Sequence, residues 1–128
     1  MILLLDTSTG ACRLTLVEDE TWHESEWQAD RQLARDLLGY LRDNLAAHSK
    51  TFDDVKGIGV FKGPGSFTGL RIGITVLNTI AETLQLPIVG EYGDDWRSNA
   101  MRRLAEAEND KIILPFYGRE ARVTAPRK

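Results

Sequence analysis

Apolar and polar positions alternate along the N-terminal part of the chain in a way that predicts β-strands. Residues 2–5 form an unbroken apolar run, which is typical of a strand buried on both faces. Over residues 12–16, apolar side chains alternate with Arg13 and Thr15, which predicts a half-buried strand. A turn at residues 18–20 leads to residues 21–27, whose high charge is typical of an edge strand. The N-terminal segment therefore predicts a three-stranded antiparallel meander.

The period of the apolar residues changes after this meander and predicts helices that alternate with strands. A leucine recurs at every fourth position from residue 33 to residue 45, which predicts an amphipathic helix over residues 31–47 with Asp30 as its N-cap. Further helices are predicted over residues 68–86, where Pro87 stops the helix, and over residues 94–108. The apolar segments 55–61, 87–90 and 111–116 predict strands. This order predicts one α/β domain, a mixed sheet with right-handed crossovers and helices on its faces.

The segment from Gly63 to Gly73 holds four glycines and one proline, too many for the interior of a packed helix or strand. Because an apolar run precedes it and a helical pattern follows, the segment predicts a strand, a tight turn and the start of a helix. Backbone N–H groups point outward at such a helix start, where anions bind readily. The segment matches neither the P-loop nor the dinucleotide-binding glycine spacing.

Candidate anion contacts lie at this turn and at the polar turn that follows the first strand. They are Asp6, Thr7, Ser8, Thr9, Gly63, Gly65, Ser66 and Arg71. Hydroxyls and amides at such turns hold phosphates, and an aspartate there orients a hydrated metal ion. On spacing alone, however, a structural role for Asp6 and Thr7 in satisfying the turn backbone is favoured. For Arg71 the alternative is a surface salt bridge.

No other residues form a catalytic constellation in the sequence. Ser66 does not lie in the Gly-x-Ser-x-Gly nucleophile elbow, and no histidine is placed to activate it. His23 and His48 have no partner at metal-ligand spacing, so both are predicted at the surface. Cys12 is predicted in the core, and a single cysteine excludes an internal disulfide and is typical of a reducing compartment. The residues alone predict no catalytic residue and no metal site.

The helix over residues 68–86 carries two apolar stripes, so it is expected to be buried on more than one side. One stripe, from Leu70 to Leu84, is sufficient to cover a sheet. The other must meet the helix over residues 31–47 or another chain. Packing within the chain explains part of it, and a shared ridge left for a partner explains the rest. The predicted partner interface comprises Leu33, Leu37, Leu38, Leu41, Ile72, Val76 and Ile80.

Length and charge narrow the possible functions. The 128 residues fit one compact domain, and the net charge of −3 argues against nucleic-acid binding through phosphate neutralisation alone. Residues 1–96 hold 8 basic and 15 acidic side chains, whereas residues 97–128 hold 8 basic and 4 acidic ones, so the C-terminal part is basic. Residues 2–5 are too few for a signal peptide or a membrane span, which predicts a cytoplasmic protein without membrane contact.

The stretch Gly63-Pro64-Gly65-Ser66-Phe67-Thr68-Gly69-Leu70-Arg71-Ile72-Gly73 resembles the signature of the bacterial TsaB family, formerly YeaZ. Ile2–Thr9 and Leu86–Gly90 fall at the matching places around it, so the resemblance covers residues 1 to about 90. It implies an actin-like (ASKHA, ribonuclease H-like) lobe, here residues 1–115, followed by a basic tail over 116–128. Family members usually continue into a second lobe. Residues 113–122 of this chain resemble the start of that lobe only faintly.

The resemblance also implies a function. TsaB-like proteins are non-catalytic subunits of the complex that places threonylcarbamoyl on adenosine 37 of tRNA (t6A), and each pairs with a TsaD-like protein, or with itself, through two helices. Those helices correspond here to residues 31–47 and 68–86. The resemblance implies no cofactor on this chain alone, ATP and a metal on the TsaD-like partner, a TsaE-like ATPase reached through the complex, and only indirect contact with tRNA.

Two other functions stay open from the sequence. A nucleotide-binding or phosphotransfer enzyme of the ASKHA type would use Asp6 and the turn over residues 63–69. A peptidase acting on a paralogue ranks last, because the sequence offers no nucleophile or metal cluster for it.

Overall fold

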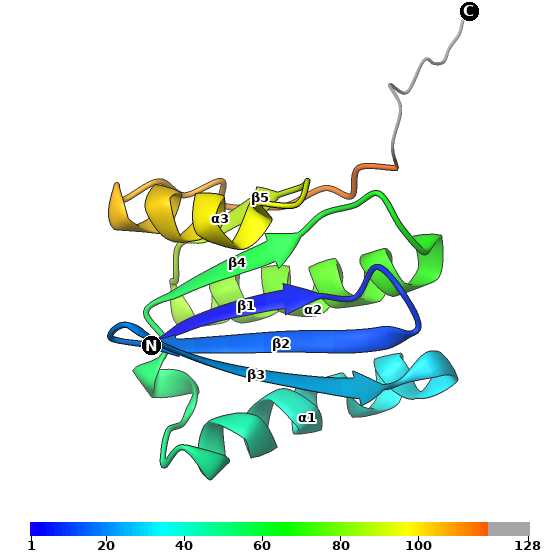
Figure 1. The fold of residues 1–128 in the computed structure, drawn as a ribbon, viewed down its shortest axis with the longest axis horizontal. Coiled ribbons are helices and arrows are strands. Elements are labelled where there is room, and N and C mark those ends of the chain that lie inside the picture. Colours follow the sequence, from blue (N-terminus) through cyan, green and yellow to red (C-terminus); the bar gives the residue numbers. More distant parts are fainter. Residues whose placement is uncertain (118–128) are drawn as a thin grey trace, which may run out of the picture.

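A computed structural model describes residues 1–117, which form one five-stranded mixed sheet with helices on both faces (Figure 1). The strands run in the order β3-β2-β1-β4-β5; β1, β2 and β3 are antiparallel, and β4 and β5 run parallel to β1. The predicted meander and the predicted strands over residues 55–61 and 87–90 are therefore confirmed. The elements are β1 (Ile2–Asp6), β2 (Ala11–Glu18), β3 (Thr21–Gln28), α1 (Leu33–Ala47), β4 (Gly57–Phe61), α2 (Phe67–Leu84), β5 (Ile88–Glu91) and α3 (Trp96–Ala105), with short 3₁₀ turns at Asp30–Gln32 and Phe52–Asp54.

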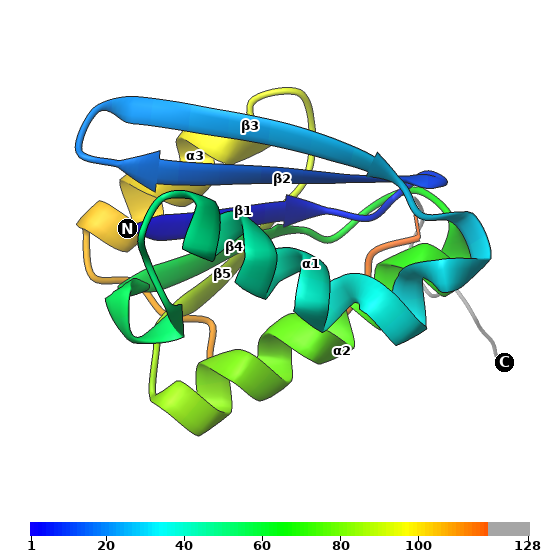
Figure 2. The same cartoon turned by 90° about the horizontal axis from the view of Figure 1, so that it is seen from below.

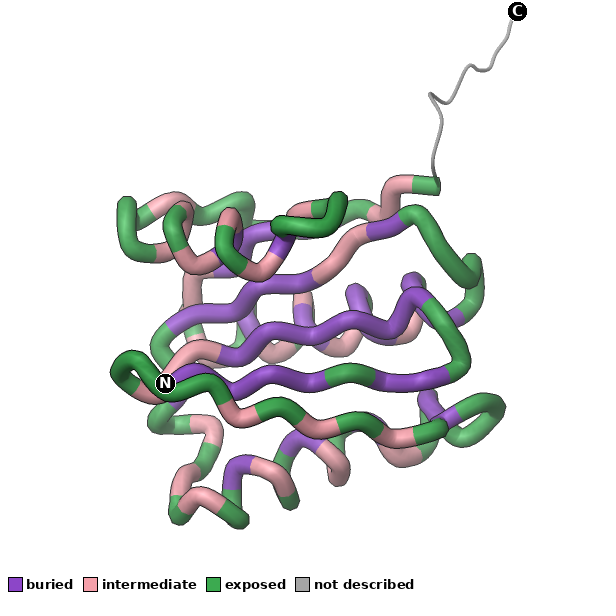
Figure 3. The backbone as a smooth tube through the Cα atoms, in the orientation of Figure 1, coloured by how far each residue is buried: buried purple, intermediate pink, exposed green. Residues whose placement is uncertain are grey.

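The helices cover the two faces of the sheet unequally. Figure 2 shows α1 and α2 side by side beneath one face, whereas α3 lies on the other face and packs against β4 and β5. The larger core lies under α1 and α2, and a smaller one, around Trp96 and Ala100, lies under α3. Burial in Figure 3 accordingly follows the central strands and declines toward β3. Within the described residues, no helix is both long and apolar enough to cross a membrane.

Strand β2 is buried more fully than its alternating pattern predicts. Cys12, Leu14 and Leu16 face the larger core, as expected. Thr15 and Val17, on the opposite face, are buried as well. The reason is α3, since Arg97 Nε donates a hydrogen bond to Thr15 Oγ1 at 3.2 Å and Val17 joins the smaller core. The prediction of a half-buried strand is wrong because the sequence of β2 carries no sign of this distant helix.

The predicted N-cap of the first helix is also wrong. Asp30 lies inside a 3₁₀ turn at φ +46°, and its carboxylate accepts a hydrogen bond from Gln28 Nε2 at 3.0 Å. Helix α1 begins only at Leu33, after Gln32, whose side chain makes no capping bond. The four leucines of the predicted stripe are nevertheless all buried, so the period located the helix correctly and only its start differs.

Residues 111–116 do not form the predicted strand, although they follow the edge of the sheet. Asp110 N donates one backbone bond to the Ile88 carbonyl at 2.8 Å. Otherwise side chains occupy the places of backbone groups in a ladder: Ile88 N donates to Asn109 Oδ1 at 3.0 Å, and Gly90 N donates to Asp110 Oδ2 at 3.0 Å. Asn78 on α2 holds the backbone of Ile113 through both its amide nitrogen and its amide oxygen. The apolar segment therefore covers the edge of β5 without pairing as a strand.

Helix α2 ends two residues before the predicted boundary. Gln85 adopts the left-handed conformation at φ +58°, which ends the helix before Pro87 is reached. Of the predicted basic tail over residues 116–128, the structure describes Phe116 and Tyr117, and residues 118–128 lie outside the described part of the chain.

Arg103 of α3 ties the last described segment to the sheet. Its guanidinium donates to the Gly90 carbonyl, and it forms ion pairs with Glu91, Glu108 and Asp110. Burial would raise the pKa of Asp110, but the hydrogen bonds from Arg103 and from the Gly90 amide outweigh it and lower that pKa. The ionised carboxylate of Asp110 is therefore part of the folded structure.

Replacing Arg103 with methionine should lower the free energy of unfolding by about 2–3 kcal/mol, because Glu91 and Asp110 lose the charge that compensates their burial. Arg102→Met is the matched control, since the neighbouring Arg102 forms only an exposed ion pair with Glu106 and should change stability by less than about 0.5 kcal/mol. Urea unfolding followed by circular dichroism measures both. Equal effects of the two variants would contradict the structural role of Arg103.

Candidate functional site

The two predicted turns meet at the carboxyl ends of β1 and β4. Because these strands are parallel neighbours, the residues that follow them emerge at the same edge of the sheet. Ser66 N donates a hydrogen bond to the carbonyl of Ser8 at 2.7 Å. A side chain at Gly65 would overlap Ser8, since an added Cβ would lie 2.5 Å from Ser8 Cβ. The structure therefore joins the two turns through backbone contact that requires glycine at position 65.

Thr7 connects the first turn to helix α2. The side chain is buried, and its Oγ1 donates a hydrogen bond to the carbonyl of Gly69 at 2.7 Å. The first two turns of α2 approach it so closely that a Cβ added at Gly73 would lie 2.2 Å from Thr7 Oγ1. A Cβ at Gly69 would lie 2.3 Å from the Thr7 carbonyl oxygen. Both helical glycines thus serve the packing of α2 against Thr7.

Other candidate anion contacts also make bonds within the protein. Asp6 Oδ1 accepts a hydrogen bond from Ser8 N at 2.8 Å, and Ser66 Oγ caps α2 by accepting one from Gly69 N at 3.2 Å. The hydroxyl of Thr9 bonds to the backbone of Ala11. Arg71 lies over the ring of Phe67, with its Cζ 5.0 Å from the ring centroid. The segment from Asp6 to Ser8 thus lies beside the turn that holds Gly65 and Ser66, and Arg71 packs on an aromatic ring.

Gly63 opens this turn at φ +122°, a region that favours glycine, and is followed by a cis peptide bond to Pro64. A Cβ at position 63 would lie 1.9 Å from the carbonyl oxygen of Phe116, so this glycine also leaves room for the last described segment. Gly63 is therefore needed for two separate reasons, its conformation and this close approach.

The other residues considered as nucleophiles or metal ligands are Cys12, His23 and His48. Burial, and after it the negative charge of Asp6, raises the pKa of the Cys12 thiol to about 12. The thiol is therefore protonated at neutral pH and is a poor nucleophile. His23 and His48 stack on each other with ring centroids 4.1 Å apart, which the sequence did not predict. Among residues 1–117, no three histidine, cysteine or carboxylate side chains are grouped to hold a metal ion.

A second candidate site is a groove between α1 and α2. Its volume is about 420 Å³, and its walls are formed by Ala34, Phe67, Thr68, Arg71, Ile72, Thr75 and Val76. Leu38 is 53% exposed, and Ile72, Val76 and Ile80 are half-buried. Leu33, Leu37 and Leu41 of the predicted interface lie in the core instead. The surface available to a partner therefore comes mainly from α2, with Leu38 on α1.

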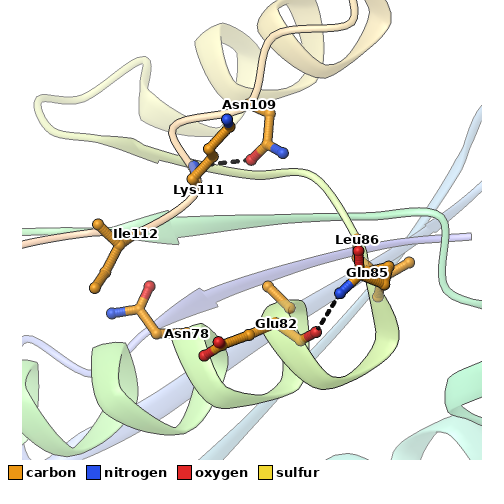
Figure 4. A pocket seen from close by; sticks show the side chains of 8 residues that line it. Asn78, Glu82, Gln85, Leu86, Asn109, Lys111 and Ile112 are labelled. Atoms are coloured by element: carbon orange, nitrogen blue, oxygen red, sulfur yellow. Dashed lines mark hydrogen bonds between the residues drawn. The ribbon is translucent and has the colours of Figure 1, made fainter.

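A third hollow, at the other end of α2, was not predicted (Figure 4). It is lined by Asn78, Ala81, Glu82, Gln85, Leu86, Asn109, Lys111 and Ile112. Asn109 Oδ1 accepts hydrogen bonds from the amides of Ile88 and Lys111, so its oxygen is fully used in holding the chain. No local pattern in the sequence marks this hollow, because it forms only when residues 109–112 fold back beside α2.

Comparisons with known proteins place this architecture in a family. The family model for TsaD, tRNA N6-adenosine threonylcarbamoyltransferase, matches residues 27–92, just over half of the chain. The TsaB protein of Escherichia coli, described as a tRNA threonylcarbamoyladenosine biosynthesis protein, is 31% identical over 112 residues, which cover 83% of this chain and 48% of the relative. The chain thus spans about half the length of this relative.

Solved structures agree with the sequence relatives. YeaZ from Pseudomonas aeruginosa superimposes with a TM-score of 0.64 at 34% identity and covers 71% of this chain and 44% of its own. Another Pseudomonas aeruginosa protein, described as uncharacterised and similar to the peptidase YeaZ, gives a TM-score of 0.67 at 35% identity, with coverage of 71% and 42%. The sheet and its helices thus define an actin-like (ASKHA) lobe. Within that class, the chain belongs to the TsaD family as a member of its TsaB (YeaZ) branch.

The contact between Thr7 and α2 predicts a specific coupling between two substitutions. Gly73→Ala alone should destabilise the protein by about 1–3 kcal/mol, because the new methyl group overlaps the Thr7 hydroxyl. In a Thr7→Ala background the same change should cost at least about 1 kcal/mol less, since the overlapping atoms are gone. Urea unfolding of the two single variants and the double variant measures the coupling.

Gly39→Ala is the matched control for this cycle. Gly39 also lies within a helix, but an added Cβ there meets only the end of the Arg42 side chain at 3.5 Å. This variant should be stabilised by about 0.5–1 kcal/mol, as expected when alanine replaces a helical glycine with space around it. Strictly additive effects of Thr7→Ala and Gly73→Ala would show that their contact does not determine the packing of α2.

Proposed function

We propose that the chain is a non-catalytic partner subunit of the t6A synthase and that it pairs with a TsaD-like protein through α1 and α2. The observation that carries this proposal is the apolar surface on these helices. Ile72 and Val76 line an open groove, and the exposed Leu38 lies on the adjoining helix, although other side chains already fill the core beneath. Apolar surface of this kind marks sites of association.

The names of the relatives support the same process. The E. coli relative is a tRNA threonylcarbamoyladenosine biosynthesis protein, and the matching family model describes a threonylcarbamoyltransferase. On this proposal, ATP, the metal ion and the transfer chemistry belong to the TsaD-like partner, and a TsaE-like ATPase joins through the complex. The chain itself contributes a docking surface. The two turns support this proposal, because the Thr7 and Ser66 hydroxyls form hydrogen bonds that hold α2 in place.

A second copy of the chain is the alternative occupant of the same surface. Two helices with a half-exposed apolar stripe are able to pack against the same helices of another copy, as in an isologous dimer. The heterologous pairing is preferred here because a related but different lobe would offer the same helix pair together with a metal site, for which residues 1–117 of this chain hold no cluster of ligands. In the complex, the partner then displaces any self-association.

Substituting Ile72 with glutamate should weaken association with a TsaD-like protein at least about tenfold, because the interface would bury a charge without a partner. Leu38→Glu should act in the same direction and is the safer variant for folding, since Leu38 is exposed. Ile112→Glu is the matched control, because Ile112 is exposed as well but lies at the hollow on the other end of α2. Isothermal titration with the TsaD-like protein of the same organism measures all three.

The thermal unfolding midpoint of each variant shows whether the fold is intact. Unchanged association of a folded Leu38→Glu variant would refute the proposed interface. The competing function, a nucleotide-binding or phosphotransfer enzyme, is separated by calorimetry with ATP and Mg²⁺ on the chain alone. Micromolar binding there would favour the enzyme, whereas the proposed subunit should show none at that level.

A further inference from the structure

Four aromatic rings form two pairs at the edge of the sheet where the two turns meet. Tyr92 pairs with Phe116, and Phe67 pairs with Tyr117, each with 5.0 Å between ring centroids. Phe116 and Tyr117 are consecutive, so the backbone links the two pairs. We call Tyr92, Phe116, Tyr117 and Phe67 the aromatic row. Its members come from three separate parts of the chain: the loop after β5, the start of α2 and the last described residues.

A cation lies at each end of the aromatic row. Lys62 Nζ is 5.6 Å from the centroid of the Tyr92 ring, and Arg71 Cζ is 5.0 Å from the centroid of the Phe67 ring. Both distances are within the range of cation–π attraction. Neither cation is among the ion pairs recorded for the described residues. The row therefore consists of two tilted ring pairs, with interplanar angles of 42° and 30°, and a cation lies over one ring of each pair.

The backbone holds the row in position. Phe116 N donates a hydrogen bond to the carbonyl of Lys62 at 2.6 Å, and Gly63 leaves the space that the Phe116 carbonyl occupies. Three residues earlier, Asn78 fixes the backbone of Ile113 from both sides. These bonds tie the segment that carries Phe116 and Tyr117 to β4 and α2. The rings nevertheless stay open to solvent, since Phe67 is 55%, Tyr92 53% and Tyr117 44% exposed.

Open rings flanked by cations match one class of ligand better than others. Unpaired nucleobases stack on aromatic faces whatever their sequence, and their phosphates lie within reach of neighbouring lysine and arginine side chains. A purely apolar protein surface would bury the rings but would leave the two cations without a partner. Base-paired RNA does not fit, because its bases are already stacked on one another.

We propose that the aromatic row is a stacking platform for unpaired bases of RNA, centred on Tyr92, with Lys62 placed against an adjoining phosphate. Phe67 and Arg71 also line the groove proposed for the TsaD-like partner, so Tyr92 and Phe116 are the rings that stay available in the complex. The inference rests on the proposed function, because a subunit of a tRNA-modifying complex meets an RNA loop. It goes further, since it gives this chain direct contact with RNA where the sequence led us to expect indirect contact. Asp94 and Asp95 follow Tyr92 closely and are exposed, so stacking rather than net charge must supply most of the affinity.

The test uses the full chain and an RNA hairpin whose unpaired loop carries the fluorescent base 2-aminopurine. Stacking on the row should quench that base, and Tyr92→Leu should weaken binding about tenfold, the usual effect of removing one stacking ring. Trp22→Leu is the matched control, because Trp22 is an exposed ring on β3 outside the row, and it should leave binding unchanged. Lys62→Met should reduce the slope of log affinity against log salt by about 0.7, as expected for one lost phosphate contact to a single strand.

A fully paired RNA duplex of the same composition should bind weakly and without dependence on Tyr92. The proposal is overturned if the hairpin binds no better than the duplex, or if Tyr92→Leu leaves hairpin affinity unchanged. Tyr92 is the decisive position because it lies outside the groove between α1 and α2, whereas Phe67 lines that groove. Loss of association with a TsaD-like protein in Tyr92→Leu, without loss of RNA binding, would make the row a protein contact and also overturn the proposal.

Failure of this inference is distinguishable from failure of the proposed function. The proposed function fails if Leu38→Glu leaves association with the TsaD-like protein intact, and no RNA is needed to observe that. The RNA-stacking proposal fails if the RNA measurement alone shows no effect, while the association with the TsaD-like protein persists.

Discussion

The contact between Thr7 and helix α2 sets the geometry on which the other parts of this lobe depend. The buried Thr7 hydroxyl, in the turn after β1, donates a hydrogen bond to a carbonyl in the first turn of α2. The same hydroxyl occupies the space left open by Gly73, and the Thr7 carbonyl oxygen occupies the space left open by Gly69. Helix and strand approach each other here more closely than any side chain would allow. Since α2 covers the larger core and also forms the groove, the angle at which it leaves the sheet decides both its buried and its exposed faces.

This contact gives the glycine-rich signature a physical explanation different from phosphate binding. Glycine-rich turns before a helix are often read as anion sites, because amides point outward there. In this lobe, Gly65 makes room for Ser8, and Gly69 and Gly73 make room for Thr7. Ser66 caps the helix instead of pointing its hydroxyl away from the protein. A sequence pattern alone thus hardly separates a phosphate loop from a tightly packed strand–helix junction. Glycine is needed in both, to expose amides in the first and to allow close packing in the second.

The elements that were predicted well are those whose signal is local. The leucine period located α1, the alternation in residues 2–27 located the meander, and the two stripes of α2 correctly indicated a helix only partly covered by its own chain. The errors in burial and strand pairing involve distant partners, whereas the start of α1 and the end of α2 differ through the local backbone conformation of Asp30 and Gln85. Residues 111–116 are apolar like a strand, yet the side chains of Asn109 and Asp110 replace their backbone in bonding to β5.

Two features of the candidate sites had no signal in the sequence at all. The burial of Thr15 depends on Arg97, which lies on another element. The aromatic row joins residues that are up to 50 positions apart, from Phe67 to Tyr117. Neither pattern has a period or a motif that would mark it along the chain. Such groupings are created by the topology, so they become visible only when the strand order is known.

The same end of α2 therefore has an inner and an outer role. On the inside, its glycines pack against Thr7, and on the outside Phe67 and Arg71 contribute to both the groove and the aromatic row. These outer side chains lie within the helical turns that the inner glycines position. On the proposed function, a change at Gly73 would affect association without touching any partner, because a displaced helix moves its whole outer surface. The glycines of α2 are thus explained by the packing that positions its outer face, even though the glycines themselves are buried.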